Sequence, residues 1–270
     1  MIHLRSISLP TVRQLPDAFP YNVPVIQSLD ELVFRSPVTF LVGENGSGKS
    51  TLLEAIACAA NLPTIGGEAV AQDPTLAEMR KLSKRLQWQW NKRTHRGFFM
   101  RSEDFFGFAK RVAQMATELR DELERVDEEY AGRSPLAKQY ARMAFAGQLH
   151  DIKDAYGEGL DAQSHGESYL KLFQARFVPG GLYLMDEPEA PLSPTRQLTF
   201  LATLNLLVKQ EAQFIIATHS PILLAYPGAT ILSFESGKIQ QAAYEELEHV
   251  TITREFLNNP AAFLRHLVEG

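Results

Sequence analysis

This sequence of 270 residues has almost no cysteine and no long apolar run. Cys58 is its only cysteine, which excludes a disulfide framework and a cysteine-based zinc site and fits a reducing compartment. No apolar segment approaches the roughly 18 to 20 residues that cross a bilayer. The N-terminal segment also lacks the basic and apolar regions of a secretory signal. We therefore expect a cytoplasmic protein without direct membrane insertion.

Charge is distributed unevenly along the chain. The net charge of −5 gives no overall attraction to nucleic acid. Residues 80–101, however, carry eight basic side chains and no acidic one, whereas residues 118–129 carry seven acidic side chains and two arginines. These two segments are candidates for an interaction surface or for mutual ion pairing.

Short apolar segments alternate with helical ones outside the middle of the chain. Ile2–Leu9 has the alternation of an edge strand. Buried strands are expected at Val38–Val42, Gly181–Met185, Gln213–Ala217 and Thr230–Phe234, and helices at Thr51–Ala60 and Pro194–Lys209. This order predicts an α/β fold with a mainly parallel sheet and antiparallel strands near the N-terminus.

The middle of the chain, at about 66–159, is expected to be a largely helical insertion in a single domain spanning 1–270. Apolar residues recur there at three- and four-residue spacing, which predicts an amphipathic helix: Phe108, Val112, Met115, Leu119, Leu123, Val126 and Tyr130. A second helix starts at Ser134-Pro135 and has Leu136, Tyr140, Met143 and Ile152 on a similar face. The two helices, joined at Gly132, predict an antiparallel hairpin.

A glycine-rich loop follows the strand at 38–42. Its residues fit the pattern G-x-x-x-x-G-K-[ST] in full: Gly43, Glu44, Asn45, Gly46, Ser47, Gly48, Lys49 and Ser50, with Thr51 opening the helix. Such a loop directs backbone N–H groups at phosphates, and the following helix adds its positive N-terminal end. Lys49 is expected to contact the outer phosphates and Ser50 to bind Mg²⁺. The pattern predicts an ATP site.

Carboxylates and a histidine follow two later strands. Asp186 and Glu187 end the strand at 181–185, where Asp186 could hold magnesium and Glu187 could activate water. His219 follows the strand at 213–217 and is expected to face the γ-phosphate. Upstream, Ser164, His165, Gly166 and Glu167 precede a helix, where serine and glutamate at this spacing also form a capping box.

These elements resemble the ATP-binding-cassette (ABC) ATPases over nearly the whole chain, in order and in spacing. By this resemblance, 43–50 is Walker A, 164–168 the signature, 182–186 Walker B, Glu187 the catalytic base and His219 the switch histidine. Two positions depart from the family pattern. Arg101 stands in place of the Q-loop glutamine, and the D-loop segment Glu189–Ser193 lacks the aspartate usual in transporters. The Asp-Glu-Pro-Glu motif is similar to that of the RecF and SMC-like ATPases and of small stand-alone predicted ATPases, often named AAA family ATPases.

The resemblance implies an ATP-dependent homodimer in which two chains close head to tail around two Mg·ATP. Ser164, Gly166 and Glu167 would complete the partner's site, and Phe19 or Tyr21 would stack on adenine. Three roles stay open: a switch in nucleic-acid maintenance or defence that binds through 80–101, the ATPase subunit of a transporter with separate permease chains, and a regulatory module with little turnover. An unidentified protein partner fits each of them.

Overall fold

The computed structural model describes residues 1–10, 16–65, 70–156 and 165–268. Its central element is a six-stranded sheet in the order β5-β6-β7-β3-β8-β9. The strands are β3 (Val38–Val42), β5 (Gly97–Met100), β6 (Leu182–Asp186), β7 (Gln213–Ala217), β8 (Thr230–Ser233) and β9 (Gln240–Ala242). All neighbours pair in parallel except β8 and β9, so the expected mainly parallel sheet is confirmed.

A second, three-stranded antiparallel sheet has the order β2-β1-β4, with β1 at Leu4–Ser8, β2 at Glu31–Val33 and β4 at Gln87–Trp90. The prediction of an edge strand at Ile2–Leu9 was wrong in its position, because β1 pairs with a neighbour on both sides. The largely helical middle was also wrong at β4. Its Gln-Trp-Gln-Trp sequence alternates with the period of a strand, and the two tryptophans are the half-buried positions.

Gln213, fully buried in β7, joins the two sheets. Its Oε1 atom accepts hydrogen bonds from the backbone N–H groups of His3 and Leu4 at 2.7 and 2.8 Å. Its Nε2 atom donates to the Leu4 carbonyl at 3.1 Å. The side chain thus satisfies three backbone groups at the start of β1.

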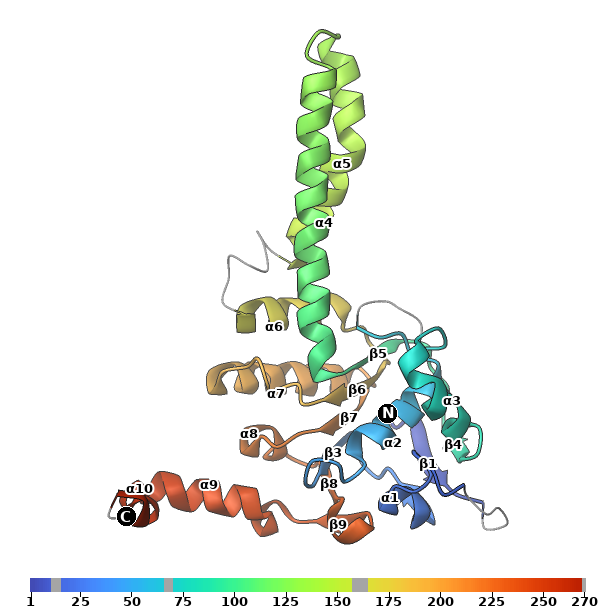
Figure 1. Cartoon of the computed structure of the whole chain (residues 1–270), viewed down its shortest axis with the longest axis vertical. Coiled ribbons are helices and arrows are strands. Elements are labelled where there is room, and N and C mark those ends of the chain that lie inside the picture. The colour runs from blue at the N-terminus through green and yellow to red at the C-terminus, as the bar shows by residue number, and fades with distance from the viewer. Residues whose placement is uncertain (11–15, 66–69, 157–164, 269–270) are drawn as a thin grey trace.

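Helices cover both faces of the six-stranded sheet (Figure 1). The helices outside the arm are α1 (Pro24–Gln27), α2 (Lys49–Ala60), α3 (Ala77–Ser83), α6 (His165–Arg176), α7 (Pro194–Lys209), α8 (Pro221–Leu224), α9 (Glu248–Asn258) and α10 (Pro260–Val268), with 3₁₀ turns at Pro74–Leu76, Glu235–Gly237 and Tyr244–Glu246. Of these, α9 and α10 extend away from the sheet (Figure 1). Strand alternation divides the core. Leu41 and Phe99 pack in one apolar cluster with α2 and the antiparallel sheet, whereas Phe40 and Phe98 pack in the other with α7 and α8.

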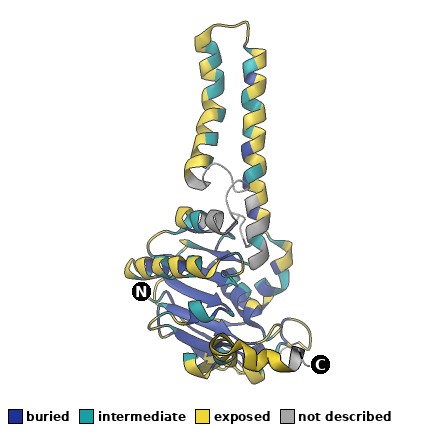
Figure 2. Ribbon diagram, turned by 90° about the vertical axis from the view of Figure 1, so that its left-hand side faces the viewer, coloured by how far each residue is buried: buried dark blue, intermediate teal, exposed yellow. Residues whose placement is uncertain are grey.

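A helical hairpin projects from this body as an arm (Figures 1 and 2). It consists of α4 (Ser102–Glu129) and α5 (Pro135–Tyr156), joined near Gly132 as expected. The 28 residues of α4 extend about 42 Å at 1.5 Å per residue. Near the far end, Asp127 pairs with Lys138 at 3.2 Å and also with Arg142.

The arm corrects part of the expected apolar stripe. Phe108, Val112 and Val126 are buried, but Met115 is 53% exposed and the neighbouring Ala116 is buried instead. On α5, Leu136, Tyr140 and Met143 are 60 to 67% exposed. A hairpin of two helices offers each helix one neighbour, so only a narrow seam is buried. None of the helices in the described ranges is long and apolar enough to cross a membrane.

Candidate functional site

The loop between β3 and α2 has the backbone conformation that its glycines predict. Gly43, Gly46 and Gly48 all have φ between 80° and 142°, which other residues rarely adopt. Gly48 is also packed tightly, because a Cβ atom there would lie 2.5 Å from Cγ2 of Val25. The loop Gly43–Gly48 is therefore fixed both by its own conformation and by the packing of α1 against it.

Lys49, at the start of α2, is 5% exposed and turns back onto this loop. Its Nζ atom donates to the carbonyls of Gly43 at 2.6 Å and Glu44 at 2.9 Å. An ammonium has three N–H donors, so these two bonds leave one donor without a partner among the residues that the structure describes. Burial lowers the pKa of Lys49, and the carboxylates of Asp186 and Glu187 oppose that shift. Ser50 is exposed in the first turn of α2, and Thr51 is buried.

Asp186 and Glu187 lie at the carboxyl end of β6, beside β7 and one strand away from β3. The backbone of Glu187 stays attached to the sheet, since its N–H donates to the Ala217 carbonyl at 2.9 Å. Its φ of 48° lies in the left-handed region, which is uncommon for a residue with a side chain. The turn directs the chain away from the sheet immediately after the strand.

His219 follows β7, and its ring faces Glu187. The His219 Nε2 and Glu187 Oε1 atoms are 3.9 Å apart, and both side chains are 40% exposed. The structure thus brings Lys49, Asp186, Glu187 and His219 to the carboxyl ends of adjacent parallel strands. Ligands of open α/β sheets bind at this edge.

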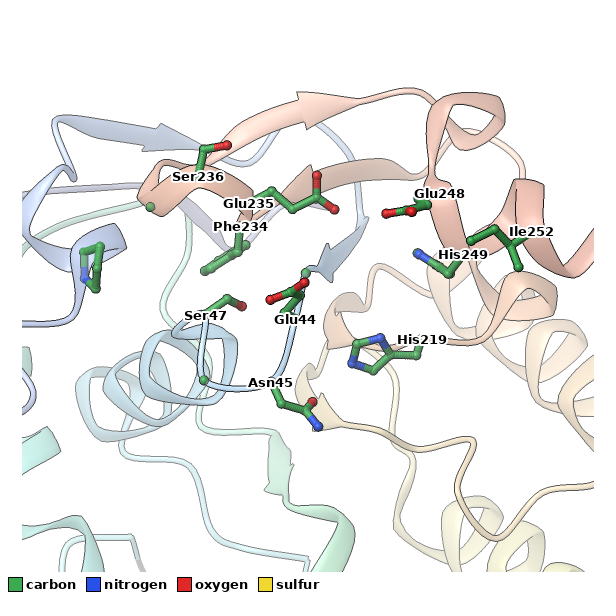
Figure 3. A pocket seen from close by; sticks show the side chains of 14 residues that line it. Glu44, Asn45, Ser47, His219, Phe234, Glu235, Ser236, Glu248, His249 and Ile252 are labelled. Atoms are coloured by element: carbon green, nitrogen blue, oxygen red, sulfur yellow. The ribbon is translucent and has the colours of Figure 1, made fainter. Parts of the chain in front are cut away.

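A cavity of about 710 Å³ opens beside the loop (Figure 3). The residues that line it are Pro24, Gly43, Glu44, Asn45, Gly46, Ser47, His219, Phe234, Glu235, Ser236, Gly237, Glu248, His249 and Ile252. Sequence reasoning missed the three residues from α9, Glu248, His249 and Ile252. The His249 ring meets that of His219 edge to face, with centroids 6.2 Å apart. No motif marks His249, and only the fold brings α9 to this cavity.

The described part of the signature segment lies in α6, away from the glycine-rich loop. Ser164 falls outside the described residues, whereas Gly166 and Glu167 lie in the first turn of α6. Helix α6 packs against α5 and α7, on the arm side of the body, whereas the glycine-rich loop precedes α2 (Figure 1). Within one chain, the structure does not bring Gly166 and Glu167 together with Lys49.

Arg101, in place of the Q-loop glutamine, connects α2 to the base of the arm. Its guanidinium lies 2.9 Å from Oε1 of Glu54 on α2 and 3.7 Å from Oδ2 of Asp73. Its backbone N–H also donates to Asp104 of α4 at 3.1 Å. These side chains are 15 to 19% exposed, so the charges are largely removed from solvent.

Two groups of aromatic residues differ from expectation. Tyr21 is 5% exposed and has Arg85 over its ring, whereas Phe19 is 58% exposed and is the accessible candidate for stacking on a base. In the basic segment, Phe98 and Phe99 are core residues, and Trp88 packs against the core while donating to the Ser83 carbonyl. The rings of Phe98 and Phe99 are therefore not available for stacking on single-stranded bases, since neither ring reaches the surface.

Comparison with known proteins gives three relationships and one family match. An AAA domain family model matches residues 23–66. The phosphonates import ATP-binding protein PhnC 2 of Albidiferax ferrireducens is 27% identical, over 99% of this chain and 91% of that protein. The macrolide export ATP-binding/permease protein MacB of Pectobacterium atrosepticum is 23% identical over 81% of this chain, which spans only 31% of that protein. An Smc head domain from Pyrococcus furiosus, with an extended coiled coil and bound to the C-terminal domain of ScpA, gives a TM-score of 0.47 at 13% identity, covering 95% of this chain and all of that one.

The alignments with the two ATP-binding relatives extend well beyond residues 23–66, which the AAA family model matches. The chain also carries the strand, loop and helix of a nucleotide site in their expected order. Relatives of this class bind ATP and hydrolyse it. The family match and the ATP-binding relatives together support an ABC-class P-loop ATPase.

Proposed function

We propose that residues 1–270 form one ATPase domain, with the insertion at about 66–159 as its arm, and that ATP binds along Gly43–Thr51. The observation that carries this proposal is the state of Lys49. Two of its donors hold the loop carbonyls of Gly43 and Glu44, and the third would contact a phosphate oxygen. The backbone N–H groups of Glu44, Asn45, Gly46, Ser47 and Gly48 would contact the remaining phosphate oxygens.

Magnesium fits the residues beside Lys49. The Ser50 hydroxyl is exposed, and the Asp186 carboxylate is near enough to act on the pKa of Lys49. Oxygen donors of this kind, completed by phosphate and water, are the ligands that Mg²⁺ prefers. When bound, the ion would neutralise charge on the phosphates during transfer.

Glu187 and His219 would complete the catalytic group. A glutamate at this strand end can accept a proton from the attacking water or orient it. The imidazole, 3.9 Å from the Glu187 carboxylate, can donate to the γ-phosphate when that phosphate arrives beside the two side chains. Lys49, Glu187 and His219 are therefore the proposed catalytic residues.

The site would be completed by a second chain. Support comes from the separation of α6 from the glycine-rich loop within one chain, because Ser164, Gly166 and Glu167 could then reach a nucleotide only in trans. The test uses Glu187→Gln with Mg·ATP, which should abolish phosphate release and trap a dimer. The 30.3 kDa chain should double its mass in light scattering, and Lys49→Ala/Glu187→Gln should stay monomeric. A monomeric Glu187→Gln protein that is saturated with ATP would contradict the composite site.

For the cellular role we propose a conformational switch in nucleic-acid maintenance or defence. Support comes from the Asp-Glu-Pro-Glu motif and from exposed cations at Lys84, Lys92, Arg93 and Arg96. Such cations suit phosphate contacts, whose affinity falls steeply with salt. Binding of a labelled DNA or RNA 30-mer to Glu187→Gln should weaken with salt. It should also weaken when Lys84, Lys92 and Arg93 become alanine, and unchanged binding would remove this surface from the proposal.

A transporter subunit is the second candidate, since both curated relatives named above are transport ATPases. Exposed apolar residues on α5, at Leu136, Tyr140 and Met143, are available to a protein partner. Isolation of Glu187→Gln with a polytopic membrane protein would favour this role. The loss of that partner in Tyr140→Asp would assign the contact to the arm.

A further inference from the structure

Glu189, two residues after Glu187, has no part in the site as described so far. Its Oε1 atom accepts a hydrogen bond from the backbone N–H of His219 at 2.8 Å. The two amides next to that of His219 donate to other acceptors. The Thr218 N–H donates to the Leu41 carbonyl at 3.2 Å, and the Ser220 N–H donates to Oγ1 of Thr218 at 3.0 Å. Glu189 thus supplies the hydrogen-bond acceptor for the backbone amide of His219.

The surroundings of Glu189 make this contact firm. Its other oxygen, Oε2, is shielded from solvent and makes no hydrogen bond to any described residue. Burial raises the pKa of the carboxyl, and the nearby Thr218 hydroxyl and the His219 amide oppose that rise. Burying a carboxylate costs free energy because the charge loses contact with water. A charge-assisted hydrogen bond from a backbone amide offsets part of that cost, so the loss of this bond would be unfavourable.

A second set of contacts joins the same two segments. The Ser220 hydroxyl donates to Oε1 of Gln197 at 2.5 Å, and Nε2 of Gln197 donates to the Leu192 carbonyl at 3.1 Å. Ser220 also caps α8 by accepting from Ile222 and Leu223 N–H. The turn after β6 and the turn after β7 are therefore linked at both ends, at Glu189 and at Gln197.

We propose that Glu189 is a positioning residue for ATP hydrolysis, which holds the His219 backbone so that the imidazole meets the γ-phosphate. The segments Glu187–Leu192 and Thr218–Ser220 then move as one unit when nucleotide or a second chain arrives. The inference rests on the proposed role of His219, and its test separates the two.

The experiment compares Glu189→Ala, Glu189→Gln and His219→Ala in steady-state phosphate release. Glutamine keeps an acceptor for the His219 amide, so Glu189→Gln should retain at least about half of kcat. Alanine removes the acceptor, and kcat should fall about 10- to 100-fold, the range expected when a reacting group is misplaced by about 1 Å. KM should change less than about threefold, because Lys49 and the loop are untouched. Glu78→Ala, a surface carboxylate on α3, serves as the matched control and should behave as the wild type.

The double variant Glu189→Ala/His219→Ala distinguishes the outcomes. If Glu189 acts through His219, the double variant should lose no more activity than His219→Ala alone. Wild-type kcat in Glu189→Ala would overturn the positioning role, and additive losses in the double variant would overturn its route through His219. An active His219→Ala would instead refute the proposed function of His219. If Glu189→Ala does not fold, Glu189→Asp applies the test, because its shorter side chain should lose the bond and the rate, and full activity would refute the inference.

Discussion

At the scale of single residues, the site depends on backbone that few side chains tolerate. Glu187 has a left-handed φ of 48° while its N–H remains bonded to β7. A left-handed conformation costs about 1–2 kcal/mol in a residue with a Cβ atom, and such strain is commonly found where function requires a direction for a side chain. Glutamine keeps the shape of Glu187, which makes Glu187→Gln a cleaner probe than a glycine at the same position.

Cys58 gives a prediction at this scale. Burial on α2 raises the pKa of its thiol to about 11. Because the thiolate is the reactive form, only about 0.1% would be ionised at pH 8 in the folded chain, against about 10% in the unfolded one, where the thiol has its ordinary pKa of 9.0. Alkylation by iodoacetamide at pH 8 should be about 100-fold faster in guanidinium than in buffer. Equal rates in the two conditions would show that the thiol is not protected.

At the scale of elements, the arm and α2 are connected by charge. Arg101 at the base of α4 pairs with Glu54 of α2 and with Asp73, and all three are largely buried. Arg101→Met should lower the free energy of unfolding by about 1–3 kcal/mol, because it leaves two partly buried carboxylates without their cation. Urea unfolding measures this. Arg101→Met/Glu54→Gln should recover part of the loss, and equal stability of the wild type and Arg101→Met would exclude the linkage.

The two faces of α4 offer a matched pair. Val112 is 7% exposed, whereas Met115 is 53% exposed. Val112→Ala should cost about 1–2 kcal/mol in unfolding free energy through the cavity that it leaves, and Met115→Ala should stay within about 0.5 kcal/mol. Equal losses in the two variants would mean that Met115 is covered in solution, for example by a partner on the arm.

Much of this architecture could be predicted from the sequence. Val38–Val42 and Gln213–Ala217 form strands at the predicted residues, because buried parallel strands are short, apolar and bounded by turn residues. The hairpin followed from helical spacing, but spacing alone could not decide whether Met115 or Ala116 enters the seam. The place of β1 between β2 and β4 depends on residues about 25 and 80 positions away, which local alternation does not report. The contacts of Glu189 and His249 with His219 also arise only when distant segments fold together.

At the scale of the whole molecule, ATP should act as a stabiliser. Ligand at about 100 times its Kd adds about 2.7 kcal/mol to the folded state, which in a chain of this size corresponds to a rise in Tm of roughly 5–10 °C. Glu187→Gln should show this rise with Mg·ATP, measured by differential scanning fluorimetry. Lys49→Ala should show little of it, and an equal shift in both variants would mean that ATP does not depend on Lys49.

The parallel pairing of β3 has a consequence for how the protein is made. The strand that leads into the glycine-rich loop has β7 and β8 as its neighbours, which are encoded about 175 and about 190 residues later. During synthesis at about 5–20 residues per second, the loop therefore emerges from the ribosome many seconds before its supporting strands do. A nascent chain that stops short of β8 would carry every residue of Walker A and still lack the sheet that holds them, so ATP can assist only the last stage of folding.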